Sequence, residues 1–386
     1  MKRIGGALLG CGFALAVAAQ HEGHGAAKGG GSRPELGASA AFDSRGQLWA
    51  VYKEGGHVML RRSPDQGRTW APARAVNAKP EPVAADGDAR PKLAVGPAGD
   101  IYVTWTQPLA RPYTGFIRFA RSVDGGDTFA EPLTVHADRQ EITHRFDAIA
   151  VTPDAKVFIA WIDKRDRTDE GFRGASLYYA VSDDRGASFR GDYRAAQHSC
   201  ECCRIALVPQ DDGSVLALWR HVFEPNVRDH AWARLGADGA AGEVRRATFD
   251  DWRIDACPHH GPSLAIDAAG RRHAVWFSGA PGKEGVFYGR LGERGPEGKR
   301  RVGGDAAEHA DIAVAGTRVA IAWKEFDGQR STLRALRSDD AGGTWREVSL
   351  ASSGGPTDQP KVLARGETFH VLWNARDEPL RVVALP

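Results

Sequence analysis

The chain has 386 residues and a formal net charge of +2, with 51 basic and 49 acidic side chains. Acids and bases are mixed along the chain, so the sequence has no basic stripe of the kind that binds nucleic acid. Beyond the first 20 residues, no apolar stretch approaches the length of a membrane-spanning helix. About 360 residues remain, enough for two ordinary domains or one large closed β architecture.

Residues 1–19 have the layout of a secretory signal peptide. A basic start, MKR, precedes a short apolar run and the small residues Ala16 and Ala18. This layout predicts an exported protein, periplasmic or secreted, cleaved after Ala18 or Ala19. Residues 8–11 also resemble a lipoprotein box, but the apolar run before Cys11 is very short, which disfavours a lipid anchor.

Residues 20–32 are rich in glycine and polar side chains, which predicts a flexible lead. If cleavage follows Ala18, His21 becomes the third residue behind a free amine, an arrangement that suits square-planar copper(II) or nickel(II). His21 and His24 can equally be two histidines without a role. The predicted organisation is therefore a signal peptide, this lead, and one folded domain over residues 33–386.

Seven copies of one strand pattern fill residues 33–386. Each copy has two short apolar strands joined by a turn, then a third strand and usually a fourth. An aromatic residue closes each second strand: Tyr52, Trp105, Trp161, Trp219, Trp276, Trp323 and Trp373. Four strands per repeat of about 50 residues predict an all-β domain, a single β-propeller in which ring closure removes exposed sheet edges. Seven blades are expected, with six as the alternative.

The last copy ends early. It reaches Pro386 after PLRVVAL, which is its third strand. Its outer strand is therefore either missing or supplied by residues 30–36, the usual way in which such rings are latched.

A turn motif, S-x-D-x-G-x-[ST]-[WF], occurs four times between third and fourth strands. Its Asp is expected to bind backbone N–H groups, its Gly to take a positive φ, and its aromatic residue to pack between sheets. The four acids are therefore predicted to be structural rather than catalytic. They are Asp65, Asp124, Asp184 and Asp340.

With these four boxes in phase with the repeat, the chain resembles the Asp-box, or BNR-repeat, proteins, whose best-known members are sialidases. The resemblance implies an exo-α-sialidase-like enzyme or a glycan-binding module with a pocket on the top face. Sialidases carry an Arg-Ile-Pro-type motif ahead of the first box, an arginine clamp, an acid/base Asp and a Tyr–Glu couple. The segment ahead of Ser63 has no such motif, and known sialidases have six blades. A complete sialidase catalytic set is therefore not recognisable, and catalysis stays open.

Three of the five cysteines lie in HSCECCR, residues 198–204. Counting back 19 residues from the aromatic anchors aligns CECC with CPHH in the next copy and ITHR in the preceding copy. Segments that precede the innermost strands converge at the mouth of a propeller channel. The donor side chains predicted to meet there are Cys200, Cys202, Cys203, Cys257, His259, His260 and His144, with Glu308, His309 and Asp358 close by.

This set of donors fits two kinds of chemistry. Thiols and imidazoles are the ligands that zinc or copper(I) prefers, so a copper or zinc site is one prediction. Disulfide bonding among the four cysteines is the other, because export favours oxidation. A bridge requires Cα atoms within about 7 Å, and three pairings are possible.

Residues 198–263 resemble a subgroup of secreted sialidase-like proteins with a C-x-C-C motif and a D-x-W-x-I-x-x-C-P-x-x-G-P segment. The long loop after Trp219 is expected to lie beside the cysteines. Candidate catalytic residues are Asp229, Asp255 and Arg228, and candidate ligands for an anionic substrate are Arg90, Arg145, Arg204 and Trp252. Each of these, taken alone, is more often a loop-capping acid or a solvated base.

Two functions of different classes follow from these patterns. One is an exported sialidase-like propeller that acts on or binds a glycan or another anionic ligand. The alternative is an exported metal-handling protein, for copper or zinc, that uses the Cys/His arc. A third reading is an interaction scaffold whose cysteines join two blades. We expect a monomer with no nucleic-acid partner.

Overall fold

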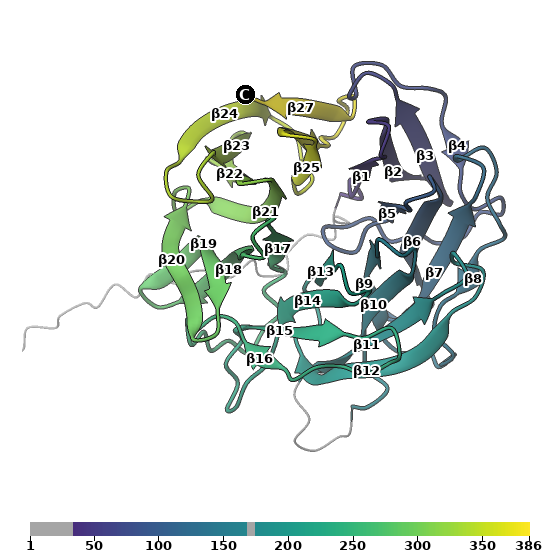
Figure 1. The fold of residues 1–386 in the computed structure, drawn as a ribbon, viewed down its shortest axis with the longest axis horizontal. Coiled ribbons are helices and arrows are strands. Elements are labelled where there is room, and N and C mark those ends of the chain that lie inside the picture. Colours follow the sequence, from purple (N-terminus) through teal and green to yellow (C-terminus); the bar gives the residue numbers. More distant parts are fainter. Residues whose placement is uncertain (1–33, 168–173) are drawn as a thin grey trace, which may run out of the picture. The chain divides into compact units, whose positions relative to one another are not determined.

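The computed structural model describes residues 34–167 and 174–386. The predicted signal peptide and lead lie outside the described residues. Every regular element in the described ranges is a β-strand, and the strands form seven sheets arranged as a ring of blades (Figure 1). The seven-bladed propeller is confirmed, and the six-bladed alternative is wrong. No helix in these ranges is long and apolar enough to cross a bilayer.

Each blade is an antiparallel meander whose strands pair in chain order. Blades 1 to 4 contain β1 (Ser39–Phe42), β2 (Leu48–Glu54), β3 (His57–Ser63) and β4 (Arg74–Ala75); β5 (Lys92–Val95), β6 (Ile101–Pro108), β7 (Gly115–Ser122) and β8 (Leu133–Thr134); β9 (His144–Val151), β10 (Val157–Asp163), β11 (Ala175–Ser182) and β12 (Arg190–Ser199); β13 (Ala206–Pro209), β14 (Val215–Arg220), β15 (His230–Leu235) and β16 (Arg245–Arg246). Blades 5 to 7 contain β17 (Ser263–Ile266), β18 (Arg272–Ala280), β19 (Lys283–Gly292) and β20 (Gly295–Val302); β21 (Ala307–Ala315), β22 (Arg318–Phe326), β23 (Ser331–Ser338) and β24 (Arg346–Ser353); β25 (Lys361–Arg365), β26 (Thr368–Trp373) and β27 (Arg381–Leu385).

The aromatic anchors all lie in the second strand of a blade. Neighbouring blades cover both faces of these strands, so the strands read as continuous apolar runs rather than as alternating patterns. In β10 and β14 every side chain is buried. The indole N–H of Trp161 donates to Asp163 over 2.8 Å, and that of Trp276 donates to Asp250 over 2.8 Å. The indole N–H groups of Trp219 and Trp373 have no hydrogen-bond partner among the described residues, so these anchors contribute apolar area alone.

The Asp boxes form the turns that the sequence predicts. In the first box, the Ser63 hydroxyl donates to Asp65 over 2.8 Å, and the backbone N–H and hydroxyl of Thr69 donate to the same carboxylate over 2.8 and 2.7 Å. The same pattern recurs at Asp124, Asp184 and Asp340. The aromatic residue packs against the neighbouring blade, as Trp345 does against Tyr288 at 4.8 Å. The four acids are structural.

The ring closes between blades 7 and 1. Each innermost strand contacts the next one around the ring, and β25 contacts β1. Blade 7 has three strands within the described ranges, and β27 is its outermost strand. The proposed latch from residues 30–36 is not seen for the described part of that segment, because Glu35 pairs with Lys53 and the Leu36 carbonyl accepts a bond from Asn374. Closure must therefore rest on other contacts.

A buried ion pair ties three blades together at this junction. The two terminal nitrogens of Arg90 each donate to one oxygen of Asp358 over 2.7 Å, a bidentate geometry. Their side chains are 2% and 4% exposed. The backbone N–H of Ala38 also donates to Asp358 over 3.1 Å, and the Ala38 carbonyl accepts from Arg90 over 2.9 Å. This cluster links the starts of blades 7, 1 and 2.

We predict that Asp358→Ala lowers the free energy of unfolding by about 3–5 kcal/mol, because it leaves the buried Arg90 charge unpaired. The matched control is Glu131→Ala, which breaks the exposed pair with Lys79 and should cost at most about 1 kcal/mol. Urea unfolding followed by tryptophan fluorescence compares the two variants with wild type. Equal losses in the two variants would contradict the assignment of ring closure to Asp358.

The boxes also predict a specific acid sensitivity. Backbone hydrogen bonds from Thr69 and Thr344 lower the pKa of Asp65 and of Asp340 to about 2. Folding therefore favours the ionised carboxylates, so their contribution is complete above about pH 4 and is lost as the pH falls towards 2. An Asp65→Asn/Asp340→Asn variant should melt at a lower temperature than wild type at pH 7. Its melting temperature should fall less than that of wild type between pH 5 and pH 2. Equal falls in the two melting temperatures over this pH range would contradict this account.

Candidate functional site

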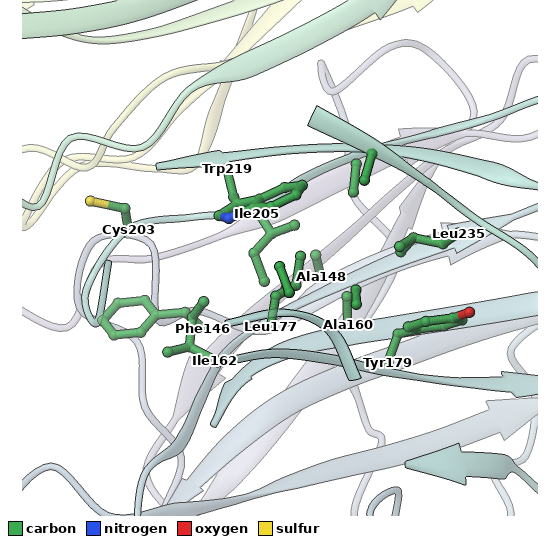
Figure 2. Close-up of a cluster of buried hydrophobic side chains, with 14 of the residues drawn as sticks. Phe146, Ala148, Ala160, Ile162, Leu177, Tyr179, Cys203, Ile205, Trp219 and Leu235 are labelled. Atoms are coloured by element: carbon green, nitrogen blue, oxygen red, sulfur yellow. The ribbon is translucent and has the colours of Figure 1, made fainter. Parts of the chain in front are cut away.

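Three thiols form a compact triangle between β12 and β13. The Sγ atoms of Cys200, Cys202 and Cys203 are 3.8, 3.9 and 3.8 Å apart in turn around the triangle, and all three residues are at most 4% exposed. These separations are far longer than a disulfide bond of about 2.05 Å, and all three cysteines are free thiols here. Figure 2 shows Cys203 beside the buried side chains of Phe146 and Trp219, which belong to the same apolar cluster.

The loop after Trp219 holds this segment in place, as the sequence predicts. The backbone N–H of Cys200 donates to the Arg220 carbonyl over 2.9 Å, and that of Val222 donates to the His198 carbonyl over 2.7 Å. Further along the same loop, Arg228 places a terminal nitrogen 3.5 Å from the Cys200 sulfur. The triangle is therefore framed by backbone hydrogen bonds and by a guanidinium group.

The electrostatics of the cluster favour a thiolate at Cys200. Hydrogen bonds from the thiols of Cys202 and Cys203 hold the pKa of Cys200 well below its usual range, and the charges of Arg220 and Arg228 act in the same direction. Burial raises the pKa of the Cys203 thiol. Of these three thiols, Cys200 is therefore the one that ionises most readily.

Cys257 lies at the solvent edge of this cluster, ahead of β17 in the next blade. It is exposed, and a hydrogen bond from the Cys202 thiol lowers its pKa. Its sulfur is not among the three donors that all lie within 4.8 Å of one another. The structure therefore brings the four cysteines to one place, with three in mutual contact and the fourth beside Cys202.

The histidines that were predicted to lie with the cysteines are not part of the thiol triangle. Ligand atoms of His260, Glu308 and His309 lie within 4.8 Å of one another and form a second donor group. His144, the first residue of β9 in blade 3, instead stacks at 4.0 Å on His136, which follows β8 of blade 2, and its Nε2 lies 3.6 Å from Asp163. His259 belongs to neither of the two donor groups.

Two of the three arginines predicted to bind an anion have structural partners. Arg90 is paired with Asp358, as described above. Arg204 donates from Nε to the Pro262 carbonyl over 2.7 Å and from Nη2 to the Gly261 and Ala310 carbonyls. The third is Arg145, whose guanidinium lies over the rings of Tyr113 and Phe146, at 6.0 and 5.0 Å. Arg228, a catalytic candidate, faces Cys200.

The two predicted catalytic acids differ in their surroundings. Asp229 is buried, which raises its pKa, and its carboxylate accepts hydrogen bonds from Arg246 and from the backbone N–H of Asp251. Asp255 is exposed. Trp252 is buried, 4.9 Å from the Arg220 guanidinium and 5.6 Å from the Phe277 ring. The catalytic role of these residues stays a prediction.

Sequence analysis placed Glu308 and His309 close to the predicted donor side chains but did not count them among the metal ligands. They lie at a β-bulge between Glu308 and Asp311, where β21 slips against β22. The signal available in the sequence was their approximate position in the repeat, which is close to that of His260 in the preceding copy.

Comparison with protein-family models and with curated protein sequences gives no match. Solved structures do match in fold. An ulvan lyase of polysaccharide lyase family PL25 has a TM-score of 0.56 at 10% identity, over 89% of this chain and 90% of that chain. A structure of such a lyase bound to -[GlcA(1-4)Rha3S]- gives 0.54, also at 10% identity over 89% and 90%.

A leech intramolecular trans-sialidase with 2,7-anhydro-Neu5Ac has a TM-score of 0.53 at 8% identity, over 88% of this chain and 82% of that chain. The fold is that of the sialidase-like propellers. At these identities the likeness concerns the fold alone, and the resemblance to a motif subgroup stays a prediction.

Proposed function

We propose that the protein is a metal-binding propeller whose cysteine triangle holds a thiophilic ion, Zn²⁺ or Cu⁺. The observation that carries this proposal is the size of the triangle. Zinc–thiolate bonds of about 2.3 Å in a tetrahedron place the sulfurs about 3.8 Å apart. The sulfurs of Cys200, Cys202 and Cys203 are 3.8 to 3.9 Å apart. An ion would therefore fit without rearrangement of the three side chains.

The surroundings of the triangle supply what a thiolate site needs. Metal ligands must be deprotonated, and the positive charges of Arg228 and Arg220 favour the thiolate at Cys200. Cys257 lies beside Cys202 on the solvent side, where it can serve as the fourth ligand. Because Cys257 is exposed, the ion has a path to and from water, which suits a handling role better than a sealed structural site.

Disulfide chemistry explains the same geometry less well. Three sulfurs in equal mutual contact can form only one bridge among themselves, and a second bridge would need Cys257. Either bridge would require the paired sulfurs to approach to about 2.05 Å, which the equal spacing of the triangle does not anticipate. A triangle with equal sides is the arrangement expected around a shared central ion.

The test is metal binding by the full chain under reducing conditions. We expect one equivalent of Zn²⁺ or Cu⁺ at the triangle, and Cys202→Ser should weaken it by more than about 100-fold because it removes a ligand. Cys257→Ser should have a smaller effect. Competition with a chromophoric chelator measures both ions, and binding of either supports the proposal. Equal binding of both ions by wild type and Cys202→Ser would overturn it.

A second candidate, binding of an anionic saccharide, is favoured by one surface feature. The Arg145 guanidinium is half-buried, and no carboxylate within residues 34–167 or 174–386 forms an ion pair with it. Beside it, Tyr113 is 77% exposed. A cation next to an exposed aromatic ring suits a sugar that carries a carboxylate or a sulfate. The likeness in fold to the ulvan lyase and the trans-sialidase also supports binding of a saccharide.

For this candidate, Arg145→Gln should weaken binding of a sulfated, uronate-containing oligosaccharide by at least about tenfold. Arg62→Gln, at an exposed position in blade 1, is the matched control and should bind as wild type does. Titration calorimetry gives the affinities. Equal affinity of the two variants, or no binding by wild type, would exclude this surface.

A further inference from the structure

We propose that His260, Glu308 and His309 form a second metal site, separate from the thiols, for a borderline divalent ion such as Zn²⁺ or Cu²⁺. Their ligand atoms lie within 4.8 Å of one another, and they come from two neighbouring blades. Two imidazoles and one carboxylate make a sulfur-free donor set that such ions prefer. The site uses none of the residues of the cysteine triangle.

The backbone on both sides of this site is fixed by one side chain. Arg204 donates through Nη2 to the carbonyls of Gly261 and Ala310, the residues that directly follow His260 and His309. Arg220 donates to the carbonyl of His260 itself over 2.9 Å. Five guanidinium donors in a rigid fork suit such bridging. The two histidines are therefore held at a set separation although they belong to different sheets.

His309 has a backbone conformation that points to a role for its side chain. Its φ is 54°, in the left-handed region, which costs a residue other than glycine roughly 1 kcal/mol or more. The bulge in β21 that contains it redirects its side chain, as bulges beside active sites do. Asn tolerates this conformation better than most residues, so the position does not require histidine for folding.

Binding of one ion by both rings requires a change in their geometry. In this structure the rings of His260 and His309 stack at 4.3 Å with an interplanar angle of 13°. An ion bound by both must lie in the plane of each ring, so one ring has to rotate on loading. A small cavity of about 10 Å³ lies beside them. It is lined by His260, Gly261, Trp276, Phe277, Val286, His309 and Ala310.

Charged groups lie next to the site. Glu308 lies 3.4 Å from Lys324 and 3.7 Å from His309 Nε2. The carboxylate is therefore adjacent to both the imidazole and a basic side chain.

The experiment counts zinc ions bound by the full chain, using titration calorimetry under reducing conditions. We expect wild type to bind one ion more than His309→Asn, which removes the imidazole but keeps a residue suited to the left-handed backbone. His260→Gln, in the other blade, should lose the same ion. The control His57→Asn changes a histidine of blade 1 and should bind as wild type does.

The two metal proposals fail independently. Cys202→Ser should keep the histidine-bound ion, and Co²⁺ bound to that variant should show no sulfur-to-metal charge-transfer absorption. If His309→Asn and His260→Gln both bind as many ions as wild type with the same affinity, the histidine site is wrong whatever the thiols do. If the histidine variants lose an ion and Cys202→Ser loses none, only the thiol site is wrong.

Discussion

The buried pair of Arg90 and Asp358 joins the two ends of the ring, and the closed arrangement of the seven blades depends on that junction. Each candidate metal site takes donors from segments that precede innermost strands, or from the first residues of such strands. In a propeller these segments lie at the mouth of the channel. Blade 7 has three strands in the described part of the chain. The ion pair therefore links the ends of the ring, where other rings use a sheet with strands from both ends of the chain. Burial of two charges is costly, and the bidentate geometry and the bonds to Ala38 offset that cost.

Most charged groups at the channel mouth serve the same structural purpose. Lys361 pairs with Asp311 at 3.1 Å between blades 7 and 6, and Arg204 links blades 4, 5 and 6 through backbone carbonyls. These side chains have their hydrogen bonds within the protein and are poor candidates for ligand clamps. The thiol triangle and the imidazole pair remain as groups with a chemistry beyond joining blades.

The periodic features of the structure could be predicted from the sequence. The spacing of the aromatic anchors gives the number of blades, and the Asp boxes mark the turns. Both features depend on local patterns that repeat. The convergence of Cys200 and Cys257 also followed from the repeat. In each case the prediction needed only the position of a residue within its copy, not the direction of its side chain.

Counting within the repeat failed where blades differ in strand length. His144 aligns with Cys202, but β9 is eight residues long and already begins at His144, which pairs with Asp163. In contrast, β13 is four residues long and begins only at Ala206. The same count therefore reaches a strand in one blade and a loop in the next. The structural use of Arg90 and Arg204 was equally hidden, because their partners lie in blades far away in the chain.

The central claim is that Cys200, Cys202 and Cys203 hold one ion together. X-ray absorption spectroscopy at the zinc edge tests it most directly, on the full His309→Asn chain loaded with one equivalent of Zn²⁺ under reducing conditions. The account predicts a first shell dominated by three or four sulfurs at about 2.3 Å. A first shell made only of nitrogen and oxygen at about 2.0–2.2 Å would contradict it.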